Sequence, residues 1–202
     1  MSPSRTGLRT TVVALRSMVI LTLVLGVAYP LVVTALGAVL LPGRSGGSTV
    51  EVAGAVVGSS LIGQSFTDAD GNPLPEYFQS RPSAAGDGYD GASSSGSNLG
   101  PENPALIAAV EERQQQVADF NSVDPGLVPP DAVTASSSGL DPHISPEYAR
   151  LQAARVAAAR DLPRAQVEEL VDDSIASREL GILGEATVNV LQLNVALDSM
   201  EG

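Results

Sequence analysis

The chain has 202 residues, a formal net charge of −12 and no cysteine. This length allows one domain of ordinary size beside a membrane anchor, and without cysteine no disulfide can stabilise that domain. The acidity argues against nucleic acid as a partner, because phosphate binding needs basic patches, and against adsorption on an anionic lipid surface.

Residues 17–43 contain no charged residue and are rich in Val, Leu, Ala and Ile. As a helix this stretch would extend about 40 Å, which is more than the ~30 Å hydrocarbon core of a bilayer. The sequence therefore predicts a tilted transmembrane helix over residues 17–41. A cleaved signal peptide is the alternative, since Ala35-Leu36-Gly37 resembles a cleavage site. The apolar run is about twice as long as a signal-peptide core, which favours an uncleaved anchor.

The arginines predict the orientation of this helix. Residues 1–44 carry four arginines and no acid, whereas residues 45–202 carry seven arginines and all 23 acids, a net charge of −16. Short basic flanks stay in the cytoplasm. We therefore expect a single-pass protein of the cell membrane with a cytoplasmic tail (residues 1–16), a flexible linker (42–49) and an extracytoplasmic domain (50–202).

Small residues in the predicted transmembrane helix indicate packing against a second helix. Gly26, Ala28 and Gly37 would let helix backbones approach closely. Pro30 in mid-span points to a protein neighbour, because neighbouring helices help to satisfy the backbone groups that a proline frees.

Beyond the linker, strand-like and helical patterns are mixed. Alternation and β-branched content predict strands over residues 55–62, 76–81, 132–135 and 187–193. Residues 82–101 are rich in Gly and Ser and read as a long loop, in which Tyr89 and Leu99 are candidate anchors.

Three helices have clear start signals. Asn103-Pro104 begins one that runs to Asn121, and Ser145-Pro146 begins another that runs to about Arg160, each with a good N-cap before a proline. A third, shorter helix follows Pro163. A last helical turn is expected near Met200. The pattern predicts an α+β domain with a small sheet and three or four helices.

Three polar segments are richer in Gly, Pro and Ser than a solvated surface needs: Tyr77–Ser83, Ser93–Pro101 and Val133–Ser145. The third contains Asp141 and His143, but no G-x-S-x-G elbow accompanies them, so we expect no catalytic triad. One histidine and no cysteine give no metal-ligand cluster. We expect His143 to be a hydrogen-bonded loop residue that steadies the start of the helix after Ser145.

A phosphate loop is excluded because the chain has no lysine. The run Ser95, Gly96, Ser97 and Asn98 remains a candidate for a backbone anion nest. A tight, internally hydrogen-bonded loop is the alternative for this run.

The strings Arg81–Ala84, Ser95–Pro101 and Ser138–Ser145, in this order after one membrane span, resemble the C subunit of the Kdp-type potassium-transporting P-type ATPases, the KdpC family. So do Gly58–Gln64 and Val188–Asn194. The resemblance covers nearly the whole chain. Its motifs are specific when taken together.

The resemblance implies a non-catalytic accessory subunit that is needed for assembly and raises the ATP affinity of its hydrolytic partner. The implied partners are a channel-like potassium-binding subunit, a P-type ATP-hydrolysing subunit and a small membrane peptide. ATP and potassium would act in the complex, with no cofactor on this chain. Any nucleotide contact here would fall on Ser95–Asn98. ATP is cytoplasmic and the domain is expected outside, so we expect the effect on ATP affinity to be indirect.

We further expect the three polar segments to converge into an interface for the channel-like subunit, with Arg81 paired to Asp141. The candidate interface residues are Arg81, Ser83, Ser95, Asn98, Ser138, Asp141, His143 and Ser145. A freestanding membrane-anchored binding or sensor module is the alternative function. The small residues in the predicted span favour the subunit of a complex.

Overall fold

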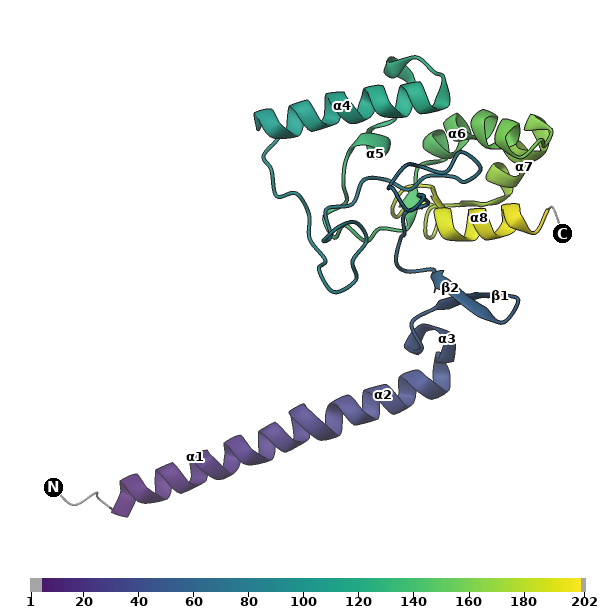
Figure 1. Ribbon diagram of the computed structural model, residues 1–202. Coiled ribbons are helices and arrows are strands. Elements are labelled where there is room, and N and C mark those ends of the chain that lie inside the picture. Colours follow the sequence, from purple (N-terminus) through teal and green to yellow (C-terminus); the bar gives the residue numbers. More distant parts are fainter. Residues whose placement is uncertain (1–4, 201–202) are drawn as a thin grey trace. The chain divides into compact units, whose positions relative to one another are not determined.

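The computed structural model describes residues 5–200. Residues 1–4 of the predicted cytoplasmic tail and residues 201–202 of the predicted domain lie outside the described part. The chain divides into two compact units, one ending at Ser48 and the other beginning at Thr49 (Figure 1).

The first unit is a long helix followed by a short one. Helix α1 (Arg5–Leu23) continues through a π-helical segment (Val24–Ala28) into α2 (Tyr29–Leu40), and α3 (Pro42–Ser45) follows within the predicted linker. The π-helical segment ends two residues before Pro30, whose ring and missing N–H disturb the regular α-helical pairing.

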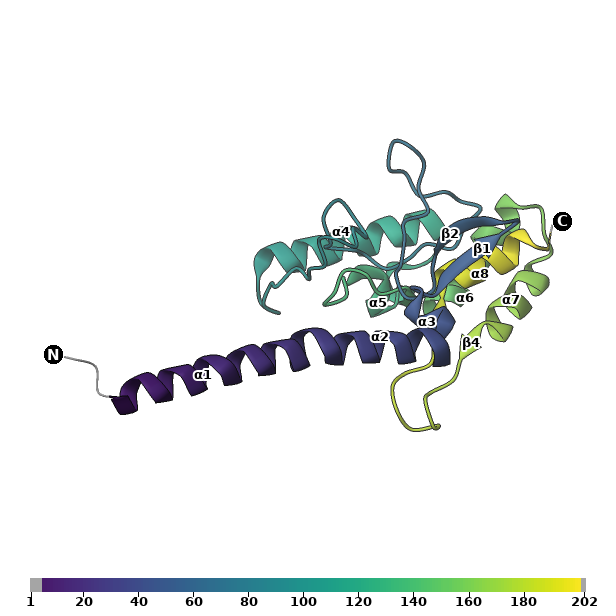
Figure 2. The ribbon, with the colours of Figure 1, turned by 90° about the horizontal axis from the view of Figure 1, so that it is seen from below.

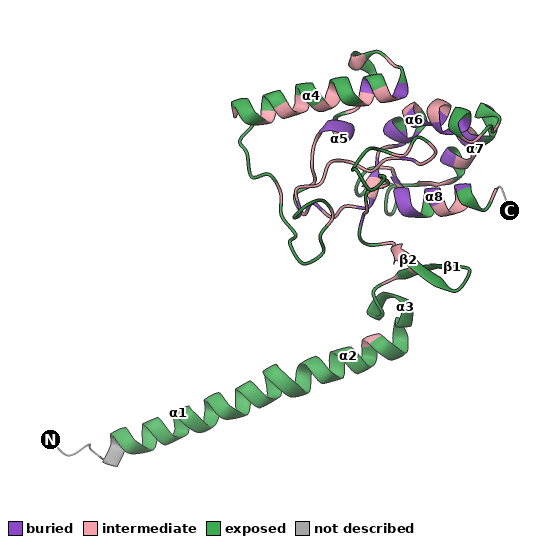
Figure 3. Ribbon diagram, viewed as in Figure 1, coloured by how far each residue is buried: buried purple, intermediate pink, exposed green. Residues whose placement is uncertain are grey.

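Within residues 5–200, one helix is long and apolar enough to cross a membrane, Gly7–Leu40, and none of it is buried in the structure. Figure 3 shows almost all of it as exposed. This finding confirms the prediction of one candidate N-terminal transmembrane helix.

The second unit begins with an antiparallel hairpin of β1 (Thr49–Val52) and β2 (Ala55–Ser59). The sequence predicted the second strand, although it extended that strand to residue 62. It missed β1, because the linker was expected to reach residue 49 and the apolar run after it is interrupted at Gly54, after which the strand was placed.

The three main predicted helices are confirmed as α4 (Pro104–Asn121), α6 (Pro146–Ala159) and α7 (Arg164–Asp173). The predicted caps are in place. The Asn103 side chain accepts a hydrogen bond from the Ala105 N–H at 2.9 Å, and the Ser145 hydroxyl accepts one from the Tyr148 N–H at 3.0 Å.

Between α4 and α6 lie a 3-10 turn, η2 (Pro125–Leu127), and α5 (Pro130–Val133). The prediction of a strand over residues 132–135 was therefore wrong, since a helix with proline at its first position occupies its start.

A small antiparallel sheet has the strand order β3-β5-β4, with β3 at His143–Ile144, β5 at Thr187–Asn189 and β4 at Ile175–Ala176. The predicted strand over residues 187–193 ends early, at Asn189. There the Asn189 side chain accepts a hydrogen bond from the Gln192 N–H at 3.1 Å and begins α8 (Val190–Asp198). The fold class, α+β with small sheets, is confirmed.

The prediction of a strand over residues 76–81 was also wrong, although the backbone of this segment is hydrogen-bonded. The amide of Asn194 on α8 exchanges two hydrogen bonds with the backbone of Phe78, at 2.9 and 3.0 Å. The amide of Gln152 on α6 does the same for Gln79, at 2.7 and 3.1 Å. Two side-chain amides thus replace the neighbouring strand that a β-ladder would require.

The core lies where α6, α7 and α8 pack with the three-stranded sheet, and Figure 3 shows buried segments concentrated in α5, α6 and α8. Its largest apolar members with exposure below 2% are Phe78, Ile144, Leu193, Leu197, Val156, Val167, Val171, Val188 and Val190. Phe78 therefore fixes the loop segment that precedes Arg81 to the helices.

Candidate functional site

The three polar segments converge, as the sequence predicted. We call residues 81–83, 95–100 and 138–145 the polar loop cluster. The Ser83 hydroxyl donates to the Gly139 carbonyl at 2.6 Å, and the Ser95 N–H donates to the Ser138 carbonyl at 3.0 Å. The backbone of the third loop thus joins the other two.

Gly139 makes this convergence sterically feasible. Its φ of +67° favours glycine, and a Cβ atom there would lie 2.6 Å from the Ser95 carbonyl oxygen and 2.7 Å from the Ala85 nitrogen. A larger residue would separate the loops. Glycine at this position is therefore explained by the geometry of the cluster.

Arg81 and Asp141 form the predicted ion pair. Arg81 Nη1 lies 3.0 Å from Asp141 Oδ2, and Arg81 Nε donates to the Thr134 carbonyl at 3.2 Å. The two side chains are 20% and 30% exposed, so water screens the pair only partly. The pair fixes the first loop to the third.

Asp141 also holds His143. Asp141 Oδ1 accepts the His143 backbone N–H at 3.0 Å and lies 3.2 Å from His143 Nδ1. His143 forms β3 just before Ser145, the N-cap of α6. The predicted position of His143 as a hydrogen-bonded residue before this helix is confirmed.

Burial raises the pKa of Asp141, but the hydrogen bonds from His143 and the charge of Arg81 outweigh it and hold the pKa below 3.8. A carboxylate whose folded pKa is depressed stabilises the fold above its unfolded pKa. That contribution disappears as the pH falls through the folded pKa.

We therefore expect Asp141→Asn to be less stable than the parent at neutral pH. The difference should shrink as the pH falls below 3.8 and through the folded pKa, because the parent carboxylate then becomes protonated. Thermal unfolding of the full chain in detergent, at neutral and at acid pH, measures this difference. A difference that stays constant, or grows toward acid, would contradict the assignment.

Two residues that the sequence did not assign to the site complete the cluster. Asp131 on α5 accepts the Ser145 N–H at 2.7 Å and the Ser145 hydroxyl at 2.8 Å. The Tyr89 hydroxyl donates to the Arg81 carbonyl at 2.7 Å, and burial raises the pKa of Tyr89 to about 12. Tyr89 is the anchor of the long loop that the sequence suggested, whereas Leu99 remains 39% exposed. No local sequence signal links Asp131 to Ser145.

Arg81, Asp141, His143 and Ser145 line a common hollow of about 480 Å³, together with Asp131 and Glu185. Three carboxylates and one arginine line it, and Asp141 and Glu185 pair with Arg81 and Arg178, so the lining keeps a net negative charge. Such a hollow repels phosphate groups.

The other predicted interface residues lie outside this hollow. Ser83, Ser95 and Ser138 are not among its lining residues, and Asn98 is exposed with φ of +53°. In the run Ser95–Asn98 the Ser95 hydroxyl donates to the Gly96 carbonyl at 3.0 Å.

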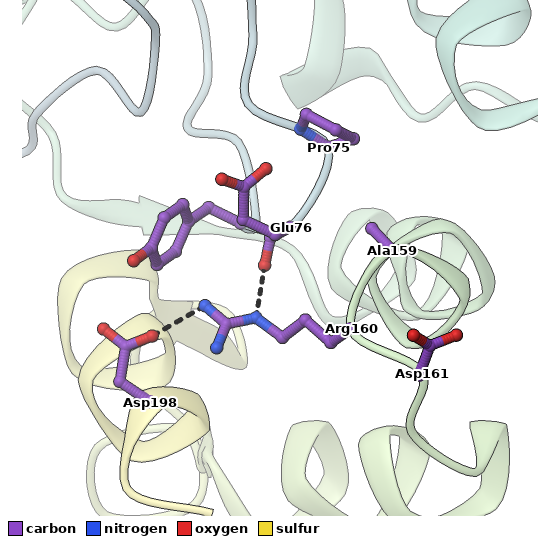
Figure 4. Close-up of a pocket in the computed structure, with 7 residues that line it drawn as sticks. Pro75, Glu76, Ala159, Arg160, Asp161 and Asp198 are labelled. Atoms are coloured by element: carbon purple, nitrogen blue, oxygen red, sulfur yellow. Dashed lines mark hydrogen bonds and ion pairs between the residues drawn. The ribbon is translucent and has the colours of Figure 1, made fainter. Parts of the chain in front are cut away.

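Two arginines at α6 support the segment that leads to the cluster. Arg160 donates to the Glu76 carbonyl at 2.7 Å and pairs with Asp198 at 2.6 Å (Figure 4). Arg155 donates to the carbonyls of Pro75 and Tyr77, and burial lowers its pKa to about 10. In the sequence both resemble ordinary surface residues of a helix, yet they fix the chain that carries Arg81.

Comparison with known proteins identifies the family of the chain. The family model "KdpC: K+-transporting ATPase, c chain" matches residues 11–199. The potassium-transporting ATPase KdpC subunit of Kineococcus radiotolerans is 54% identical over 196 residues, covering 97% of this chain and 93% of that one. The KdpC subunit of Mycobacterium tuberculosis is 50% identical over 188 residues, covering 93% and 96%. That of Nitratidesulfovibrio vulgaris is 51% identical over 176 residues, covering 87% and 86%. The chain therefore belongs to the KdpC family, the c chain of the potassium-transporting ATPase.

Proposed function

We propose that the chain is a non-catalytic accessory subunit needed for assembly of the potassium-transporting ATPase. Its domain lies on the outer face of the membrane, and the polar loop cluster forms a rigid platform for a channel-like subunit near its potassium entrance. The single observation that carries this proposal is the convergence of three polar loops around the Arg81–Asp141 pair. Hydrogen bonds within the cluster fix the shape of these loops. An interface that is already ordered loses less conformational entropy when its partner binds.

The same geometry supports an indirect effect on ATP. Three carboxylates line the hollow beside Arg81, and residues 82–112, which include the run Ser95–Asn98, contain no arginine or lysine to neutralise a triphosphate. We therefore assign no cofactor to this chain. ATP acts on the P-type hydrolytic subunit and potassium on the channel-like subunit. A change in ATP affinity is transmitted through the membrane subunits, which include a small membrane peptide.

The orientation can be tested with reporter fusions. Because three of the four arginines near the span precede it, a reporter active only in the cytoplasm should be silent when fused after Gly202. The same reporter fused before Met1 should be active and serves as the control. Activity of the C-terminal fusion would place the domain inside and refute this part of the proposal.

Assembly can be tested in the membrane helix. A Cβ at Gly37 would lie 3.8 Å from the Ser45 Cβ, an ordinary van der Waals contact, so the first atom of a side chain at this position is accommodated. We expect Gly37→Leu and Ala28→Leu to insert normally and to reduce recovery of the other subunits about fivefold or more, because bulky side chains separate packed helices.

The exposed position Leu36, changed to Phe, provides the control for added bulk, because it lies about 80–100° around the helix from both Ala28 and Gly37. Recovery measured by pull-down from detergent gives the comparison. Ala28 and Gly37 are nine residues apart and lie on opposite faces of the helix, so each variant tests its own face. If both variants match the parent, both of these faces point at lipid.

A further inference from the structure

An exposed apolar loop lies between β4 and β5. Leu180, Ile182 and Leu183 are 87%, 77% and 56% exposed. In Figure 2 the segment after β4 projects from the domain as a narrow loop. Clustered exposed side chains of this size mark interaction sites in soluble domains.

The loop has a defined shape. The N–H groups of Ile182 and Leu183 both donate to the Glu179 carbonyl, at 3.2 and 2.9 Å, and Glu179 and Leu183 form an isolated β-bridge. Leu180 has φ of +53°, an unfavourable conformation for leucine. A strained turn that presents three apolar side chains to solvent is preorganised for a partner.

Charge at the base of the loop argues against lipid as that partner. Glu179 and Glu185 flank the apolar tip, and Arg178 pairs with Glu185 at 2.9 Å, so Glu179 leaves one net negative charge at the base of the loop. The surface of a membrane rich in anionic lipid repels such a tip. Two copies of the loop would also repel each other, which argues against self-association.

The loop is continuous with the polar loop cluster. Glu185, Ala186 and Thr187 line the same hollow as Arg81 and Asp141. Protein interfaces combine an apolar centre with a polar rim, and these two neighbouring features supply both.

We propose that residues 179–184 are the apolar anchor of this subunit and insert into an apolar pocket with a basic rim on the channel-like subunit, the partner proposed for the adjoining polar loop cluster. This inference rests on the proposed function. It adds the residues that carry the contact and the chemistry of the surface that receives them.

The absence of natural cysteine makes a direct test available. Ile182→Cys introduces a unique thiol, which reacts with maleimide only where water allows the thiolate to form. Leu127→Cys is the matched control, since Leu127 is 67% exposed in η2 on another part of the domain. Labelling rates with a membrane-permeant maleimide are compared for the full chain expressed alone and with the other subunits.

We expect the thiol of Ile182→Cys to react about ten times more slowly, or slower still, in the complex than in the chain alone. The thiol of Leu127→Cys should react at the same rate in both. Equal rates for Ile182→Cys, in a complex recovered intact, would overturn the inference and leave the proposed function standing.

Two other outcomes are also decisive. Protection of the Ile182→Cys thiol in the chain alone would mean that lipid or a second copy covers the loop, which overturns the inference. Failure to recover any complex with the tagged parent chain would overturn the proposed function as well.

Discussion

Replacing Asn194 by leucine is expected to lower the free energy of unfolding by about 2–6 kcal/mol. Asn194 is 1% exposed and makes both hydrogen bonds of the Phe78 backbone. Leucine fills a similar volume but leaves a buried N–H and a buried carbonyl without partners, each at a cost of about 1–3 kcal/mol. The segment that carries Arg81 would lose its attachment to α8.

Gln192→Leu is the matched control, because Gln192 lies on the exposed face of the same helix and should change stability by less than about 0.5 kcal/mol. Urea unfolding of the full chain in detergent, followed by tyrosine fluorescence, measures both variants. A loss below about 1 kcal/mol for Asn194→Leu would show that the Phe78 backbone finds other partners.

The sequence predicted those features whose signals are local. Asn103-Pro104 and Ser145-Pro146 each combine a capping side chain with a proline at the first helical position, and both helices begin there. The apolar run before Leu41 could be recognised as a candidate membrane-spanning helix from its length and composition alone. The polar loops were predicted to converge because their Gly and Pro content suited fixed backbone shapes rather than a core.

The errors arose where distant residues decide the structure. The alternation over residues 76–81 indicates a strand, yet the hydrogen-bond partners of this segment are side-chain amides 73 and 116 residues further along the chain. Nothing in the segment itself reveals Gln152 or Asn194. The apolar alternation after Thr187 likewise continues past Asn189, where a capping amide turns the chain into α8.

The candidate site was also only partly predictable, because some of its contacts depend on where distant residues are placed in the fold. Arg81 and Asp141 were paired by sequence reasoning because each lies in a loop that cannot be core and their charges are opposite. Asp131 was missed, since its bonds to Ser145 span 14 residues and depend on the placement of α5. The exposed loop at Leu180 was also missed, because exposure of an apolar residue is a property of the folded domain.

Arg81→Ala is expected to destabilise the polar loop cluster by about 2 kcal/mol, between the ~1 kcal/mol of an exposed ion pair and the ~3–5 kcal/mol of a buried one. The change removes the cation beside Asp141 and the hydrogen bond to the Thr134 carbonyl. Arg150→Ala is the matched control. Arg150 pairs with Asp172 at 2.8 Å, but both side chains are at least half exposed, so its loss should be nearly neutral.

The most direct test of the account combines two readings on one preparation of the complex that contains Arg81→Ala. Recovery of the other subunits with the tagged chain reports assembly, and the ATP dependence of potassium-stimulated hydrolysis reports nucleotide affinity. We predict that recovery and total activity fall together by about fivefold or more, while the complex that does assemble keeps the parent KM for ATP. An intact complex in normal yield with a raised KM for ATP would contradict the account, because the polar loop cluster would then serve the nucleotide rather than the interface.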